Sequence, residues 1–220
     1  MVNAPEFIPR SCLTSTYQPP FTILCKTLMA FLICSSGTKQ LVRVNLDSQS
    51  EISLIRKSIC DSLNMSGDKK LLRMIVSGGD LKVVKHQRSV TFTLASIDGK
   101  YVTPPIEACT TPRISSPLAP IKVDPNGFPW LKGLSWTEQL PMEDGPKVMD
   151  ILLGEPWVSE VTDELAIPNP IKGPAPSFNK PCCTRTKLGN CLSGAVESNC
   201  AGGVQKVHFT VQDCSKSSFS

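Results

Sequence analysis

The apolar residues in the first third of the chain follow first a strand-like and then a helix-like pattern. Residues 21–34 are aliphatic and β-branched, residues 35–38 (Ser-Ser-Gly-Thr) are typical of a turn, and apolar positions alternate with polar ones over 40–46. Two such segments around a glycine-bearing turn predict a β-hairpin. In residues 50–65, isoleucines and a leucine recur every three or four positions, which predicts a helix that Gly67 closes.

Strand character returns over residues 71–109, where turn signals divide the apolar runs. These signals are Ser-Gly-Gly-Asp at 77–80 and Asp-Gly at 98–99, the second of which is typical of a hairpin. Residues 110–146 are rich in Pro and Gly, and a second apolar run follows at 148–158. The patterns together predict a mainly antiparallel β domain with one or two short helices. The three tryptophans, Trp130, Trp136 and Trp157, are expected to pack against its aliphatic core.

Composition narrows the class of protein. A length of 220 residues suits one domain, and 40% hydrophobic residues suffice for a core. The net charge of +4 is too small to indicate nucleic acid, and the short basic cluster Lys69, Lys70 and Arg73 is interpreted as a solvated loop. We therefore do not expect this segment to bind nucleic acid.

The two ends carry no predicted structural element. Residues 1–20 hold four prolines and no apolar period, so they are predicted to form a flexible lead-in without a signal peptide. The most apolar run, 21–34, contains Lys26 and is too short to span a bilayer. The expectation is a cytoplasmic protein that does not contact a membrane, in which the ten cysteines are mostly reduced.

The cysteines and histidines do not form a recognisable metal or nucleophile motif. Those at the C-terminal end lack the paired spacing of a zinc site. Cys25, Cys34, Cys60 and Cys109 lie in apolar runs and are interpreted as small core residues. The two histidines have no motif partner, and neither a nucleophile elbow nor a phosphate-binding glycine loop occurs. No metal and no cofactor are predicted.

One acidic residue stands out by its position. Asp47 follows a predicted strand and precedes Ser48, a placement typical of an ordinary turn but also of an aspartic-protease loop, in which a hydroxyl braces the carboxylate. About a hundred residues later, 150–154 is an apolar run ending in Gly154. It is either an ordinary buried strand and turn or a segment that passes beneath such a loop, where glycine permits close backbone approach.

Four motifs in order extend this second interpretation. They are LVRVNLDSQSEISLIRKSICDSL, VTFTLASIDGK, DILLG and TKLGNCLSG. In this order, the four motifs resemble the aspartic peptidase domain of BEL/Pao-type retrotransposon polyproteins, and the resemblance covers roughly residues 21–196. The matching positions are Leu46, Asp47, Ser48 and Ser50 in the first motif, 150–154 in the third, and Thr186, Leu188, Gly189, Ser193 and Gly194 in the last.

The resemblance implies a fold and a division of the chain. The fold would be a retropepsin-like closed, antiparallel β barrel with irregular termini. The peptidase domain would cover 21–165, a family-typical extension 166–196, and a cysteine-containing tail 197–220.

The resemblance also implies roles for particular residues. Asp47 and Ser48 would be catalytic, and a flap would close over the substrate. The residues supporting the site would be Gln49, Ser50, Leu152, Leu153 and Gly154, and the flap tip would consist of Ser77, Gly78, Gly79 and Asp80.

The implied function is aspartic endopeptidase activity on a polyprotein, of which this chain would be a fragment. A water activated between two Asp carboxylates would hydrolyse the peptide bond. The chain has one loop of this kind, so the resemblance implies a homodimer with Asp47 from each subunit. The alternative is a catalytically inactive remnant that only binds peptide or protein.

Two positions depart from the family pattern. Gln49 replaces a glycine, which would cost ~1–3 kcal/mol if its backbone adopts a conformation open only to glycine. The Gln49 side chain would also crowd the catalytic water. Asn190 stands where the family has tryptophan.

Overall fold

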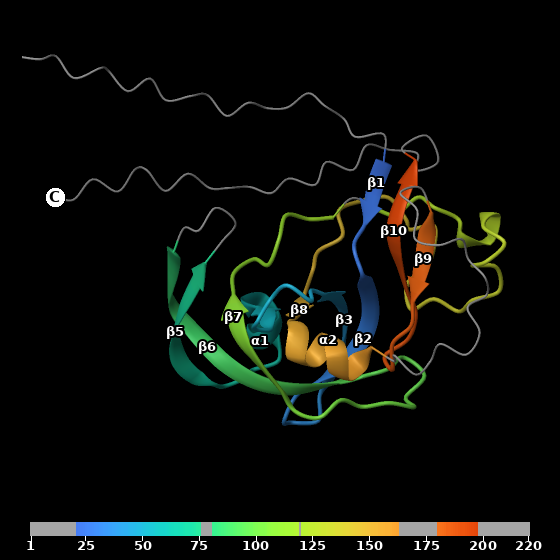
Figure 1. Ribbon diagram of the computed structural model, residues 1–220. Coiled ribbons are helices and arrows are strands. Elements are labelled where there is room, and N and C mark those ends of the chain that lie inside the picture. Colours follow the sequence, from blue (N-terminus) through green and yellow to red (C-terminus); the bar gives the residue numbers. More distant parts are fainter. Residues whose placement is uncertain (1–20, 76–80, 119, 163–179, 198–220) are drawn as a thin grey trace, which may run out of the picture.

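The computed structural model describes residues 21–75, 81–118, 120–162 and 180–197, which form a β barrel with a projecting hairpin on one side and a small second sheet on the other (Figure 1). The predicted lead-in, the tail beyond 197 and the proposed flap tip lie outside these residues. The strands are β1 Phe21–Leu24, β2 Thr27–Ile33, β3 Lys39–Leu46, β4 Leu54–Arg56, β5 Asp68–Ile75, β6 Leu81–Ala95, β7 Ile106–Thr111, β8 Ile151–Leu153, β9 Pro181–Thr184 and β10 Cys191–Glu197. The helices are α1 Lys57–Ser62, α2 Glu155–Val161 and the 3₁₀ turn η1 Pro125–Gly127.

Six strands close the barrel. Their order is β2-β3-β8-β4-β7-β6, and pairing of β2 with β6 completes the ring, while β5 joins only β6. This confirms a mainly β fold with a closed barrel and short helices. The expectation of an antiparallel barrel is wrong in two places, because β3 with β8 and β4 with β7 are parallel pairs. No helix among the described residues is both long enough and apolar enough to cross a membrane.

The predicted hairpin between 21–34 and 40–46 is confirmed as β2 and β3. Alternate residues of both strands fill the barrel, and Leu28, Leu32, Val42 and Val44 are fully buried. Gly37 makes the turn with a φ of +80°, a left-handed conformation that favours glycine. The run 21–34 divides, however, because its first four residues form β1 in the other sheet.

The predicted helix over 50–65 is wrong in its first half. Residues Leu54–Arg56 form β4 between β7 and β8, and only Lys57–Ser62 is helical. The helix ends at Ser62, and Asn64, with a φ of +51°, lies beyond its end and before Gly67. Over so short a run, isoleucines spaced by three or four fit the period of a strand as well as that of a helix. These residues form a strand because they pair with β7 on one side and β8 on the other.

The strands after this helix are longer than their apolar runs. β5 begins at Asp68, and β6 is one strand of 15 residues rather than two. The hairpin signal at 98–99 is confirmed, with Gly99 at a φ of +72°.

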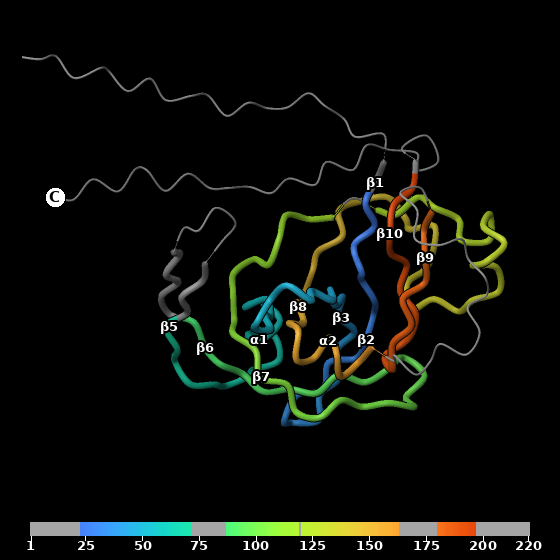
Figure 2. The backbone as a smooth tube through the Cα atoms, in the orientation of Figure 1, coloured from blue at the N-terminus to red at the C-terminus, as the bar shows by residue number. Residues whose placement is uncertain are grey.

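The second sheet, of order β1-β10-β9, packs on the Pro- and Gly-rich segment of the chain. Figure 2 shows this yellow-green segment, residues 120–142, running beside β9 and β10. Leu24, Leu192 and Val196 of the sheet form a core with Leu131 and Met142 of the segment. Trp130 and Trp136 pack against this second core and Trp157 against the barrel core, as expected.

Candidate functional site

Asp47 lies where β3 ends, beside the last residue of β8. The parallel register sets Leu46 opposite Leu153, and the next backbone N–H, that of Asp47, donates to the Leu153 carbonyl at 3.0 Å. This bond anchors Asp47 at the rim of the barrel. Between the projecting hairpin and the second sheet, the segment that follows β3 lies near β8 and α1 (Figure 1).

The loop after β3 holds the Asp47 carboxylate by a backbone contact. The N–H of Gln49 donates to Asp47 Oδ1 at 3.0 Å, and the N–H of Ser50 donates to the Asp47 carbonyl at 3.2 Å. Within the described part of the chain, no hydrogen bond reaches Asp47 Oδ2. The carboxylate therefore keeps one oxygen available to a ligand or a second carboxylate.

Ser48 does not brace this carboxylate within the single chain. The side chain is exposed and its hydroxyl makes no hydrogen bond to the residues that the structure describes. The contact that holds the carboxylate is instead the N–H of Gln49.

Gln49 is not strained. Among the described residues other than glycine, only Asn64 has a positive φ, so the backbone of Gln49 lies in a region open to every residue type. The expected cost of ~1–3 kcal/mol therefore does not arise. A glycine at this position would offer the carboxylate a backbone N–H, and the N–H of Gln49 already makes that hydrogen bond.

Gly154 forms the floor under the loop. A Cβ at this position would lie 2.7 Å from the Ser50 carbonyl oxygen and 2.7 Å from the Ile52 backbone. The N–H of Gly154 donates to Ser53 Oγ at 3.1 Å, and the N–H of Glu155 donates to the Ser50 carbonyl at 2.7 Å. The loop and the β8–α2 junction are thus in direct backbone contact, which only a residue without a side chain allows.

The supporting residues named from the sequence divide into two kinds. Leu153 is fully buried in the barrel core, whereas Leu152, on the other face of β8, is half-buried. Ser50 supports the loop through its carbonyl and through its hydroxyl, which donates to the Ile52 carbonyl at 2.8 Å. Sequence reasoning missed Ser53, which is buried and whose partner, Gly154, lies 101 residues away.

A half-buried ion pair ties together the three strands beneath the loop. Asp150 Oδ1 accepts hydrogen bonds from Arg56 at 2.5 and 3.2 Å, and its Oδ2 accepts the backbone N–H of Arg43 at 3.0 Å. Arg43 in turn pairs with the buried Glu138 at 2.7 Å. Asp150 therefore links β8 to both β3 and β4, a role that the motif DILLG gave no reason to assign.

The C-terminal motif fixes the second sheet to the barrel. Thr186 accepts the Leu188 N–H at 3.1 Å and donates to the Gly189 carbonyl at 2.7 Å, which forms a tight turn. Gly189 has a φ of +123° and leaves no room for a Cβ beside Thr137. Asn190 donates to the Ser135 carbonyl at 2.8 Å.

Burial makes two of the thiols near this motif poor nucleophiles. Burial raises the pKa of Cys191 to about 12 and that of Cys183 to about 11, so both are neutral thiols at physiological pH. Cys34 and Cys60 are buried, whereas Cys25 and Cys109 are half-buried. No group of three or more metal-ligating side chains occurs among the described residues.

The predicted flap tip, residues 77–80, lies outside the described residues. The two strands that flank it are β5 and β6, which pair as far as Ile75 with Leu81. In Figure 1 this pair forms the arm that projects on the side of β7 and α1.

No protein-family model matches the chain, and neither a curated protein nor a solved structure matches it. The case for a function therefore rests on the residues and geometry described above.

Proposed function

We propose that the chain is an aspartic endopeptidase of the retrotransposon polyprotein type, with Asp47 as its acid/base. The observation that carries the proposal is the position of Asp47. It sits at a strand end, its N–H is bound to Leu153, and its loop rests on Gly154. An ordinary turn aspartate needs neither a parallel strand beside it nor a glycine floor beneath it.

The chemistry requires a second carboxylate. One Asp47 carboxylate would accept a proton from the attacking water while the other, protonated, donates to the peptide carbonyl. The chain has one loop of this kind, so the second carboxylate would come from a twin subunit across a two-fold axis. The two carboxylates would then share one proton between them.

The substrate would be a peptide in an extended conformation. It would lie between the Asp47 loops and the β5–β6 hairpins and add strand-like hydrogen bonds to them. Closure of the hairpins would keep all water except the attacking one away from the reacting carbonyl.

The alternative is a remnant that binds peptide without cleaving it, and the exposed Gln49 side chain favours it. A side chain next to Asp47 can occupy the position of the catalytic water even when its backbone is unstrained. The two candidates differ only in whether that side chain blocks the water.

Replacing Gln49 with glycine distinguishes these functions. If the chain is a peptidase, the wild-type protein is expected to cleave an unfolded protein substrate between about pH 4 and 6, because pairs of aspartates in such enzymes work in the acid range. The Gln49→Gly variant should cleave at least as fast, because the N–H that binds Asp47 remains. Cleavage by the glycine variant alone supports the remnant, and cleavage by neither variant contradicts the peptidase. Product formation followed by mass spectrometry provides the measurement.

A further inference from the structure

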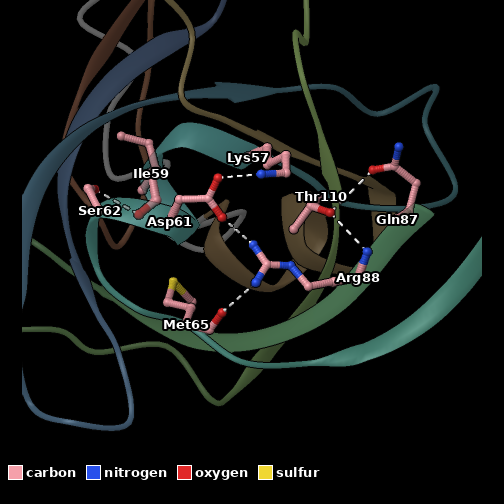
Figure 3. A network of polar contacts seen from close by, with 8 residues as sticks. All are labelled: Lys57, Ile59, Asp61, Ser62, Met65, Gln87, Arg88 and Thr110. Carbon is pink, nitrogen blue, oxygen red and sulfur yellow. Dashed lines mark hydrogen bonds and ion pairs between the residues drawn. The ribbon is translucent and has the colours of Figure 1, made fainter. Parts of the chain in front are cut away.

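The root of the β5–β6 hairpin is fixed to the barrel by a network of polar contacts (Figure 3). One Arg88 nitrogen, Nη2, donates to Asp61 Oδ1 at 2.5 Å, and the other, Nη1, donates to the Met65 carbonyl at 3.2 Å. Lys57 binds the second oxygen of Asp61 at 2.5 Å. A single guanidinium therefore joins β6 to the helix α1 and to the chain that follows it.

A second set of contacts holds the same root from the β7 side. The backbone N–H of Arg88 donates to Thr110 Oγ1 at 2.9 Å, and that hydroxyl donates to the amide oxygen of Gln87 at 3.2 Å. Gln87 and Thr110 are buried. A Cβ on Gly67 would lie 1.8 Å from the Ser89 carbonyl oxygen, so the backbone entering β5 is pressed against β6.

The hairpin changes register directly beyond this root. Residues 68–70 pair with 87–89, whereas 72–75 pair with 81–84, so Leu71 faces two residues of β6. A β-bulge of this kind breaks the ladder locally and bends the strand. Pairing of β6 with β7 reaches only as far as Ser89 with Cys109. Beyond the bulge, each strand of the hairpin therefore pairs, among the residues that the structure describes, only with the other.

The contacts of Arg88 with Asp61 and Met65, here called the clamp, reach the segment of the chain that carries Asp47. The chain runs from the Asp47 loop through β4 directly into α1, and α1 holds both Lys57 and Asp61. A shift of the hairpin root relative to α1 would change the distance between the hairpin and the Asp47 carboxylate.

We infer that Arg88 is a positioning residue, which fixes the hairpin root (68–70 and 87–89) to the Asp47-bearing segment, and that this fixation ends at the β6 bulge opposite Leu71. The inference rests on the proposed function for its consequence in catalysis, but the clamp itself can be tested without a substrate. The ammonium of Lys57 and then the guanidinium of Arg88 hold the pKa of Asp61 below its ordinary value. A lowered carboxyl pKa keeps the clamp charged above about pH 4, and the clamp weakens only as the pH falls through that lower value.

Hydrogen exchange of wild type, Arg88→Ala and Lys69→Ala provides the test. Lys69 is the matched control, because it is exposed and lies directly opposite Arg88 in the register. In wild type, residues 68–70 and 87–89 should exchange at least about tenfold more slowly than 72–75 and 81–84. Arg88→Ala should remove this difference, Lys69→Ala should keep it, and Asp61→Asn should reduce it in part.

Kinetics complete the test. With a peptide substrate, Arg88→Ala should raise KM about tenfold while kcat changes less than about twofold, and Arg88→Lys should restore part of the loss. Equal exchange on both sides of the bulge in wild type, or unchanged root exchange in Arg88→Ala, would overturn the clamp. Loss of root protection without any peptide cleavage would instead leave the clamp in place and contradict the proposed function.

Discussion

Asp47→Asn is expected to abolish peptide cleavage, with a loss of at least about 10³-fold in kcat. An amide can still accept the Gln49 N–H at its oxygen, so the loop should keep its geometry. It cannot exchange a proton with the attacking water or with the partner carboxylate. The measurement is the rate of cleavage at the wild-type optimum, with the unfolding midpoint as a check on folding.

The matched control for this variant is Asp98→Asn. Asp98 lies in the turn after β6, and its Oδ1 accepts the N–H of Lys100, two residues on, at 3.1 Å, the same backbone contact that Asp47 makes with Gln49. Asp98 has no glycine floor and no parallel strand beside it, so its variant should cleave as fast as wild type. Cleavage that survives in Asp47→Asn would reject Asp47 as the acid/base.

Gly154→Ala is expected to destabilise the fold and to remove activity together. The added Cβ would stand 2.7 Å from backbone atoms of Ser50 and Ile52, which cannot move without moving the Asp47 loop. Overpacking of this kind costs about 1–3 kcal/mol or more. Gly154 has a φ of −80°, which alanine adopts readily, so the cost would come from contact and not from backbone strain.

Urea unfolding measures the effect, since the midpoint falls with the free energy of unfolding. Gly127→Ala is the control, because a Cβ there would meet nothing within 4 Å. A Gly154→Ala protein as stable and as active as the Gly127→Ala protein would contradict the proposed contact between the loop and its floor.

The parts of the fold that could be predicted from sequence are those set by local patterns. The β2–β3 hairpin follows from alternating apolar residues around Gly37, and the turn at 98–99 follows from Asp-Gly. The helix over 50–65 failed because its first half pairs with β7 and β8, which lie far away in sequence. A three-residue strand carries too few positions for its period to be distinguished from that of a helix.

The residues of the candidate site likewise divide into those that a local pattern identifies and those that depend on distant partners. Asp47 and Gly154 could be found because each belongs to a short motif, and the contact between the Asp47 loop and residues 152–154 could be expected from the resemblance. Ser53 and Arg56 act through partners about a hundred residues away, Gly154 and Asp150, so no local pattern identifies them. Arg88 is similar, since its partner Asp61 lies on a helix whose position depends on how the barrel closes.

The most direct test of the central claim is the activity of mixed dimers. Wild-type and Asp47→Asn chains, unfolded and refolded together in varying ratios, would pair at random across the two-fold axis. If each site needs one carboxylate from each subunit, activity falls as the square of the wild-type fraction, to about a quarter in an equal mixture. A linear fall, to about half, would show that each chain works alone and would contradict the account.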